Sequence, residues 1–504
     1  MNSACKSVIK KLTLITYPNQ NIKFSGTIIK TIVYEEIHFI CRCDCLNSLF
    51  NKKTGNPTGH TGTKTDMELW LTTGNRSSLL ELQKQPLNFG NGEAGLATIT
   101  VNDQKKYQTI DGFGYTLTGG SASLINGLDN NTKDALLKEL FSLEGNGIGV
   151  NYLRVSIGGS DLSADTFTYN ELPKGQTDIN QDKFSMAEEM KDLVPILKKI
   201  VALQPDIKIL GSPWTAPTWM KTNGSFKGGE LKPEYYVSYA KYLIKYIHAM
   251  KKEGITIDAI TIQNEPLHPG NVPSMYMEAK TQADFIKKAL GPEFKAAGIK
   301  TKIIIYDHNA DRPDYPIDIL NDPEAKKYVD GSAFHLYGGD ISALSKVHEA
   351  HPDKNLYFTE QWVGGPSKFD EDLKWHVSTL IIGATRNWSR NVLEWNIAAD
   401  PAYKPHTVGG CTTCLGAITI SPEVSRNVAY YVIGHASKFV PANSVRIESN
   451  LPEALPNVAF LRPDGKKVVI AVNNDHTEKR FNIADKDRQV TVSLPAGAAG
   501  TFVW

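Results

Sequence analysis

The chain has 504 residues, with 55 Lys and Arg against 54 Asp and Glu, so its formal net charge is +1. This balance gives no reason to expect nucleic acid or an acidic polymer as a partner, whereas a neutral ligand is compatible with it. No run of about 18 consecutive apolar residues occurs, which predicts a protein without a membrane-spanning helix. The length suits more than one domain, and the sequence leaves the oligomeric state open.

Residues 1–66 do not fit the pattern of the rest and are predicted to be an atypical, poorly ordered N-terminal extension. Four of the six cysteines lie there, but Cys41-x-Cys43-x-Cys45 lacks the histidines that a metal knuckle would need at a suitable spacing. No clear signal peptide is visible, because Leu12–Tyr17 is shorter and more polar than the apolar core of a secretory signal. We therefore expect the folded protein to begin near Met67.

Residues 67–108 contain two strand-like segments, Leu69–Thr72 and Ala97–Val101. Between residues 109 and 425, apolar strands alternate with amphipathic helices, which is typical of a (β/α)8 TIM barrel of the α/β class. The predicted barrel strands are Thr109–Gly114, Ile148–Gly158, Ile207–Trp214, Ile257–Glu265, Lys302–His308, Ser332–Tyr337, Leu356–Glu360 and Val392–Asn396. The predicted helices include Met186–Leu203, Pro233–Lys252, Lys280–Ala297 and Glu371–Arg386. Chemistry in such a barrel lies at the C-terminal ends of the strands.

Two of the predicted strands end in a glutamate. Glu265 closes the fourth strand, and Pro266 stops that strand because proline has no N–H to donate in a sheet interior. Glu360 closes the seventh strand. Both carboxylates are therefore predicted at one mouth of the barrel. Cleavage of a glycosidic bond needs such a pair, because one acid protonates the leaving oxygen while one carboxylate attacks or stabilises the oxocarbenium-like carbon.

Cys411 and Cys414 follow two glycines in the loop after the eighth predicted strand. A single CxxC supplies only two thiolates, and no second pair lies nearby, which argues against zinc. A redox motif of the thioredoxin type would open a helix after a strand, which this glycine-rich loop does not do. A disulfide that clamps the loop and two free thiols both remain open.

Residues 426–504 change from alternating strand and helix to strands alone and are predicted to form a β-sandwich. The expected strands are Val445–Glu448, Val458–Leu461, Lys467–Asn473, Gln489–Leu494 and Thr501–Trp504. Turn residues such as Pro463-Asp464-Gly465 separate them.

Four segments together resemble glycoside hydrolase family 30, which includes glucosylceramidases and β-1,6-glucanases. They are Asn264-Glu265-Pro266, Tyr357-Phe358-Thr359-Glu360, His335-Leu336-Tyr337 and the ten residues from Ser212 to Lys221. The resemblance runs from about Glu68 to Trp504. It implies a side β-sandwich built from the N-terminal and C-terminal strands, a retaining mechanism, and neither a cofactor nor a metal.

The resemblance also implies a role for each matching residue. Glu265 matches the acid/base and Glu360 the nucleophile. Asn264 matches the residue that binds the sugar 2-hydroxyl, and Arg154 a cation near the nucleophile, where it would favour the ionised carboxylate. Two further pairs complete the expected site, with Asp161 and Trp214 on the outer hydroxyls and Tyr337 and Trp395 as aromatic walls.

The predicted substrate is a β-glucan or β-glucoside, and the Gly409-Gly410-Cys411-x-x-Cys414 loop favours the β-1,6-glucanase branch. Family members are usually exported, so the resemblance implies a secreted or periplasmic enzyme. The alternatives are a glucosylceramidase-type or general β-glucosidase and, from another class, a non-catalytic glycan-binding protein. A lone glutamate at a strand end could equally be an ion-paired rim residue. We expect His335 to be a satisfied strand-end histidine rather than a ligand, and Trp219 to pack in the core.

Overall fold

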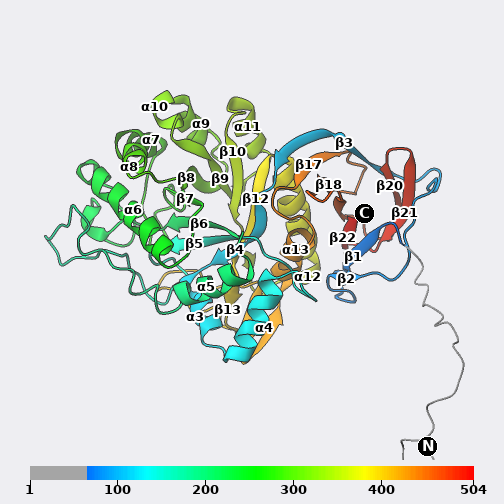
Figure 1. Ribbon diagram of the computed structural model, residues 1–504, viewed down its shortest axis with the longest axis horizontal. Helices are drawn as coiled ribbons and strands as arrows, with labels where there is room; N and C mark the ends of the chain where they lie inside the picture. The colour runs from blue at the N-terminus through cyan, green and yellow to red at the C-terminus, as the bar shows by residue number, and fades with distance from the viewer. Residues whose placement is uncertain (1–64) are drawn as a thin grey trace, which may run out of the picture. The chain divides into compact units, whose positions relative to one another are not determined.

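The computed structural model describes residues 65–504 (Figure 1). The predictions for the extension 1–66 and for Cys41, Cys43 and Cys45 lie almost entirely outside the described residues. Within residues 65–504, no helix is both long enough and apolar enough to span a bilayer.

Eight parallel strands close into a barrel in the order β10-β12-β4-β5-β6-β7-β8-β9, which confirms the predicted fold class. Their bounds are β4 Gly112–Leu117, β5 Tyr152–Ile157, β6 Lys208–Pro213, β7 Ala259–Thr261, β8 Lys302–Ala310, β9 Val329–Gly339, β10 Asn355–Glu360 and β12 Ser389–Asn396. The first strand begins at Gly112 rather than Thr109, because Thr109 ends the preceding strand, β3. Long apolar runs form these strands because both of their faces are buried.

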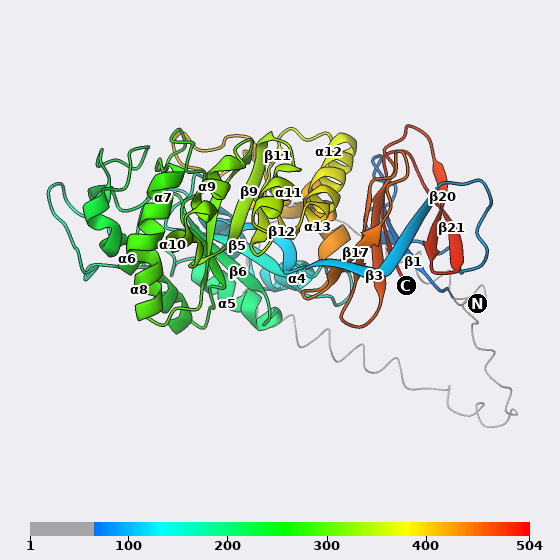
Figure 2. The same cartoon turned by 90° about the horizontal axis from the view of Figure 1, so that it is seen from above.

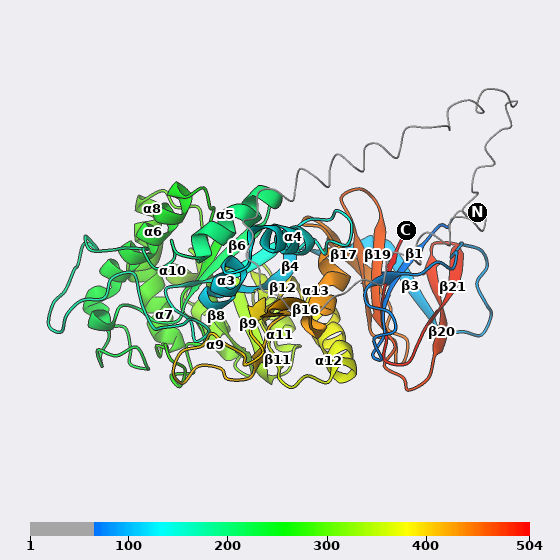
Figure 3. The same cartoon turned by 90° about the horizontal axis from the view of Figure 1, so that it is seen from below.

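Helices surround the barrel strands, and α3, α4 and α5 lie side by side outside them (Figure 3). The helices are α3 Gly119–Asn126, α4 Asn130–Phe141, α5 Leu193–Leu203, α6 Tyr236–Lys252, α7 Ala279–Phe285, α8 Gly291–Ala296, α9 Asp314–Asn321, α10 Pro323–Lys326, α11 Ala343–Ala350, α12 Phe369–His376 and α13 Val428–Ser437. The side chains of Thr118 and Asp129 cap α3 and α4.

Three predicted helices differ from the observed ones. The helix predicted from Met186 begins only at Leu193, and Pro195 then lies in its first turn, where proline is tolerated. The other two are interrupted by the π-helical segments Ile286–Leu290 (η3) and Val377–Ala384 (η4). A π-helical turn leaves no clear mark in apolar spacing, so the pattern predicted continuous helices.

Within the described residues, nine strands form the sheet of the side domain, in the order β2-β1-β22-β19-β18-β17-β3-β20-β21. They are β1 Glu68–Thr72, β2 Glu81–Leu82, β3 Thr98–Thr109, β17 Val445–Ser449, β18 Asn457–Leu461, β19 Lys467–Val472, β20 Lys479–Asp485, β21 Arg488–Leu494 and β22 Ala499–Val503. Strand β3 lies between β17 and β20, as Figure 2 shows, and β1 pairs with β22. N-terminal and C-terminal segments therefore share one domain, as predicted.

Helix α13 lies between the barrel and the side domain. It packs against β4 and β12 of the barrel. Its His435 bonds Thr501 of β22 at 2.9 Å and the hydroxyl of Thr72 in β1 at 2.8 Å. The predicted boundary at residues 425 and 426 thus falls just before a helix that belongs to neither part alone.

Candidate active site

Glu265 and Glu360 lie in one pocket at the C-terminal end of the barrel strands. Glu360 is the last residue of β10, and Glu265 lies in the loop that follows β7. Both residues are buried, with exposed fractions of 5% for Glu360 and 8% for Glu265. A carboxylate oxygen of each lies within 4.8 Å of the other and of a His335 ring nitrogen. The structure therefore brings together the two glutamates that the sequence predicts as a pair.

The pocket has a volume of about 280 Å³ and contains seven of the eight predicted site residues, while Arg154 lies beneath it. Its lining consists of Asp161, Trp214, Asn264, Glu265, His268, Asn271, His308, Asn309, Tyr337, Glu360, Trp362, Trp395, Cys411 and Cys414. A larger cavity of about 550 Å³ is lined by Tyr152, Lys208 and Asp258 among others, and it contains neither glutamate. The candidate active site is therefore identified by the chemistry of its lining residues and not by its volume.

Arg154, on β5, is fully buried and joins three of the site residues. Its Nη1 donates to Glu360 Oε2 at 2.5 Å, and its Nη2 donates to Asn264 Oδ1 at 2.6 Å and to Asp307 Oδ2 at 2.8 Å. Because the guanidinium is planar, these bonds fix the two carboxylates and the amide relative to one another. The cation predicted near Glu360 is therefore in contact with it.

Asp307, on β8, was missed by the sequence analysis although it is fully buried at the centre of the site. It accepts hydrogen bonds from the side chains of Arg154, Ser212, Thr261, His335 and Thr359. Although burial alone would raise the pKa of Asp307, the charges and bonds of Arg154 and His335 hold it well below its usual range. The signal was present in the sequence, because Asp307 ends the apolar run Ile303–Tyr306 just as the glutamates end theirs.

His335 forms a hydrogen bond on each ring nitrogen, as expected for a satisfied histidine, although it lies within β9 rather than at its end. Its Nε2 lies 3.0 Å from Asp307 Oδ1, and its Nδ1 lies 3.3 Å from Glu265 Oε1 and 3.8 Å from Glu360 Oε1. Burial opposes its charge, but the three carboxylates outweigh burial and raise the pKa of His335 to about 9. The imidazolium therefore stands between the two glutamates near neutral pH.

The two glutamates titrate as an interacting pair. Burial raises the pKa of Glu360, and the charge of Glu265 adds to this, against the opposite effects of His335 and Arg154. Burial also acts on Glu265, but the hydrogen bond and charge of His335 lower the pKa of Glu265 below its usual value. In the free pocket, the field thus favours a proton on Glu360 over one on Glu265.

The aromatic side chains of Trp214, Tyr337, Trp362 and Trp395 line the pocket, and Trp362 was not predicted. Trp214 and Trp395 are buried with ring centroids 5.6 Å apart, and the Arg154 guanidinium lies 4.8 Å from the Trp214 ring. The Tyr337 hydroxyl donates to Glu360 Oε1 at 3.0 Å. Although 41% of the Tyr337 surface is exposed, its hydroxyl end is enclosed, and burial raises its pKa well above the usual value. Trp219 instead packs on Tyr235 outside the pocket, as expected.

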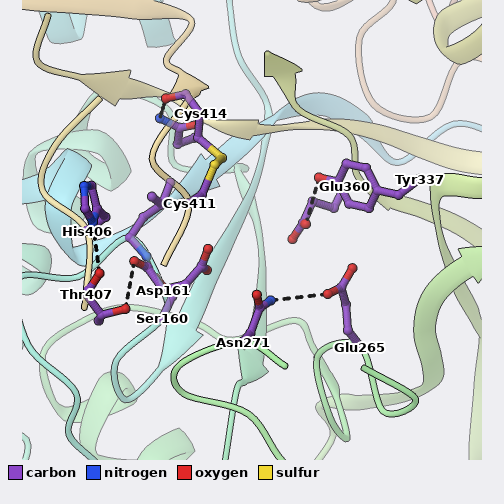
Figure 4. Close-up of a disulfide and its surroundings, with 12 residues drawn as sticks. Ser160, Asp161, Glu265, Asn271, Tyr337, Glu360, His406, Thr407, Cys411 and Cys414 are labelled. Atoms are coloured by element: carbon purple, nitrogen blue, oxygen red, sulfur yellow. Dashed lines mark hydrogen bonds between the residues drawn. A yellow bond between two sulfur atoms is a disulfide. The ribbon is translucent and has the colours of Figure 1, made fainter. Parts of the chain in front are cut away.

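Two further features of the pocket were not predicted as site residues. Asn271 Nδ2 donates to Glu265 Oε2 at 3.4 Å from the loop after β7, as Figure 4 shows. Cys411 and Cys414, which the sequence left as either a disulfide or two thiols, form a disulfide, and both line the pocket. Asn271, Cys411 and Cys414 are uncharged and do not follow a regular apolar pattern, so nothing in the sequence indicates that they line the pocket.

Glu265, His335 and Glu360 would offer three ligand atoms to a cation. The contacts of His335 Nδ1 already account for this closeness, because this nitrogen is hydrogen-bonded to Glu265 and lies at ion-pair distance from Glu360. The geometry of the three residues thus follows without an ion, and the expectation of no metal and no cofactor stays a prediction.

A barrel that carries a glutamate after its fourth strand and another at the end of its seventh, in one pocket with a buried arginine, has the architecture of a glycosidase. Comparison with known families agrees. Residues 110–440 match the glycosyl hydrolase family 30 TIM-barrel domain, and residues 443–502 match the family 30 beta sandwich domain. The chain therefore belongs to glycosyl hydrolase family 30 and is a glycosidase.

Individual relatives are similar over most of the chain. The endo-1,6-beta-D-glucanase BGN16.3 of Trichoderma harzianum is 33% identical over 443 residues, which are 82% of this chain and 88% of that protein. The lysosomal acid glucosylceramidase of Mus musculus is 29% identical over 510 residues, with 94% and 95% of the two chains covered. The solved structure of the endo-beta1,6-glucanase BT3312 superposes with a TM-score of 0.81 at 36% identity, covering 87% of this chain and 99% of that one.

Proposed function

We propose that this glycosidase cleaves β-1,6-linked glucan by a retaining, double-displacement mechanism. The observation that carries the mechanism is the separation of at most 4.8 Å between oxygens of Glu265 and Glu360. Retaining enzymes hold their two carboxyl groups about 5–5.5 Å apart, whereas inverting enzymes need about 6.5–9.5 Å to admit a water. The short distance in this pocket supports the retaining class.

Glu360 is the proposed nucleophile. Arg154 and the Tyr337 hydroxyl each donate to one of its oxygens, so the carboxylate is held in one orientation. Asn264 commits its oxygen to Arg154, which leaves its amide N–H groups for the sugar 2-hydroxyl. A bond to that hydroxyl strengthens as positive charge develops on the ring. Asp161, Trp214 and Trp395 are proposed to hold the remainder of the sugar from the pocket walls.

Glu265 is the proposed acid/base. Acid catalysis needs the pair's proton on Glu265, although the field of the free pocket favours Glu360. The reacting sugar resolves this, because the developing positive charge at the anomeric carbon lies next to Glu360 and stabilises its ionised form. The proton then belongs on Glu265, where it is delivered to the leaving oxygen. In the second step, Glu265 takes a proton from the water that hydrolyses the glycosyl-enzyme.

Substitution of each glutamate tests these roles. Glu360→Gln should lower kcat by at least about 10⁴-fold. Glu265→Ala should slow substrates with a poor leaving group but keep cleavage of activated aryl glucosides, and azide should restore its rate. Glu189→Gln is a matched control, because Glu189 is also a buried glutamate but bonds Tyr169 outside the pocket. Near-native turnover by Glu360→Gln would refute the assignment.

Similarity to endo-1,6-glucanases supports the β-1,6 linkage, and similarity to the mouse glucosylceramidase supports a second candidate, cleavage of a glucosylated lipid. A product profile on β-1,6-glucan, β-1,3-glucan and glucosylceramide distinguishes them. Glucose or oligosaccharides released from β-1,6-glucan alone would support the proposal, whereas turnover of glucosylceramide alone would favour the second candidate.

We also propose that the enzyme is exported. The Cys411–Cys414 disulfide supports this, because disulfides persist in oxidising compartments. Activity recovered only from the cytoplasmic fraction of the producing cell would contradict the proposal.

A further inference from the structure

The disulfide between Cys411 and Cys414 forms part of the wall of the catalytic pocket (Figure 4). Cys414 is buried in an apolar cluster with Leu162, Trp214 and Trp395, against which Cys411 also packs. The bond therefore lies beside the aromatic wall proposed for the sugar, although no step of the mechanism uses it.

The segment before the disulfide holds the backbone of Asp161. The Thr407 N–H donates to Asp161 O at 2.9 Å, and the Thr407 hydroxyl lies 3.3 Å from the same oxygen and 2.5 Å from Val272 O. A Cβ placed on Gly410 would lie 2.3 Å from Asp161 O, so the two backbones approach as closely as glycine allows. One segment thus joins the loops that carry Asp161 and Val272.

The same loop also acts on the Asp161 carboxyl. This group is buried, and burial together with the charges of Glu360 and Glu265 raises the pKa of Asp161 to about 7. The backbone N–H of Cys411 acts in the opposite direction and lowers the pKa of this carboxyl, and both residues line the pocket. Figure 4 shows Asp161 between Thr407 and Cys411 at the edge of the pocket. The contacts that fix Asp161 are thus those of Thr407 and Gly410 with its backbone, and Cys411 follows them directly in the chain.

The other end of the disulfide is fixed to the barrel side of the pocket. Cys414 pairs with Gly364 where strand β14 (Cys414–Leu415) meets strand β11 (Val363–Gly364). The Gly365 N–H donates to Thr413 O at 2.8 Å. Strand β11 begins three residues after Glu360. The disulfide thus links a strand anchored beside Glu360 to the backbone that holds Asp161.

We propose that the Cys411–Cys414 disulfide is a positioning element for the sugar: it holds the loop against Asp161, and its reduction releases Asp161 and weakens substrate binding. This inference rests on the proposed function of Asp161 as a sugar-binding residue. The chemical step needs an external dithiol. One of its thiolates attacks a cysteine sulfur and breaks the S–S bond, and its second thiol closes the mixed disulfide. Two cysteine thiols and the oxidised dithiol result, and two electrons pass to the protein.

The experiment compares kcat and KM of the full chain on an aryl β-glucoside before and after treatment with dithiothreitol, with thiols counted by titration. Reduction should raise KM by about 10-fold, as expected for the loss of the hydrogen bond between the sugar and the Asp161 carboxylate. It should change kcat by less than about 3-fold. The variant Cys411→Ser/Cys414→Ser should reproduce this result and be unaffected by dithiothreitol, which controls for the other four cysteines.

A double-mutant cycle then separates positioning of Asp161 from a general structural role. In an Asp161→Asn background, reduction should change KM by less than about 2-fold, because the group that the loop positions has already been removed. An unchanged KM on reduction of the wild type would overturn the proposal, and so would an equal KM increase in both backgrounds. An inactive oxidised wild type would instead contradict the proposed function.

Discussion

Asp307→Asn tests whether the buried charge network organises the site. Both Asp307 oxygens only accept hydrogen bonds, so an amide nitrogen at either position would face a donor. The donors are Arg154, Ser212 and Thr261 on one oxygen and His335 and Thr359 on the other. The substitution therefore removes a charge and also creates a mismatched contact, while it preserves volume.

The magnitude follows from the two cations that Asp307 contacts. A His335 pKa raised from 6.5 to about 9 corresponds to about 3 kcal/mol in favour of its charged form. Three carboxylates supply this energy, so the share of Asp307 is about 1 kcal/mol. Arg154 keeps Glu360 as a partner but loses its second carboxylate, which costs about 2 kcal/mol more. Together, the losses at His335 and Arg154 should lower the free energy of unfolding at pH 7 by about 3 kcal/mol.

The pH dependence gives a sharper test. Because the folded pKa of His335 lies above its unfolded value, its favourable contribution is fully present below pH 6.5 and is lost as pH rises through about 9. The stability difference between the wild type and Asp307→Asn should therefore narrow by about 1 kcal/mol between pH 6.5 and pH 9.5. Comparing the two proteins removes the effects of groups that titrate identically in both.

Urea unfolding at each pH measures this difference, and hydrolysis of an aryl β-glucoside should show kcat/KM lowered by about 10- to 100-fold. Asp485→Asn is the matched control, because Asp485 is a buried aspartate in the side domain that accepts from Lys467 and Trp504. The control should lose stability but keep kcat/KM. An Asp307→Asn protein as stable as the wild type to within about 0.5 kcal/mol would refute the reasoning.

Two further substitutions probe the pocket and the barrel. Tyr337→Phe removes one of the two donors to Glu360 and should lower kcat by about 10-fold without a change in melting temperature; equal kcat values would show that Arg154 alone orients the carboxylate. Gly114→Ala would place a Cβ 1.9 Å from the carbonyl oxygen of Tyr152 on the neighbouring barrel strand, so we expect a loss of more than about 3 kcal/mol of stability. Gly90→Ala, which meets no atom within 4 Å, is its control, and equal stability of these two variants would contradict the close strand approach.

The barrel was predictable because each of its strands is an apolar run that ends in a polar or aromatic residue. The side domain was less so. Strand β20, Lys479–Asp485, was missed because its two leading cations and its asparagine hide the buried residues Phe481 and Ile483. Helix starts also resisted prediction, as Leu193 shows, since apolar spacing continues into residues that form turns. The spacing of apolar residues indicates which residues are buried, whereas tertiary contacts determine where a helix or strand begins.

Glu265 and Glu360 were predicted from the ends of two apolar strands, and the other six site residues from a resemblance. The sequence did not reveal the buried residues that hold these eight in place. Asp307 and His335 each follow an apolar stretch, but nothing local in the sequence shows that one aspartate accepts from five donors on five other strands. Such a set exists only once the barrel closes. The central place of His335 in the site was not predicted, because its partners Asp307 and Glu265 lie 28 and 70 residues away in the chain.

The backbone at the barrel mouth shows why the site needs the whole fold. Glu265, Tyr306 and Asp307 have φ values of 45°, 74° and 64°, although none is glycine or asparagine. Such conformations cost about 1–3 kcal/mol each and persist only where the surroundings enforce them. Here the Glu265 N–H donates to Asp307 O at 3.0 Å, so the strained loop residue and the irregularity within β8 hold one another. The strain at Glu265 aims an acid at the pocket, and it is sustained by the same aspartate that fixes Arg154 and His335.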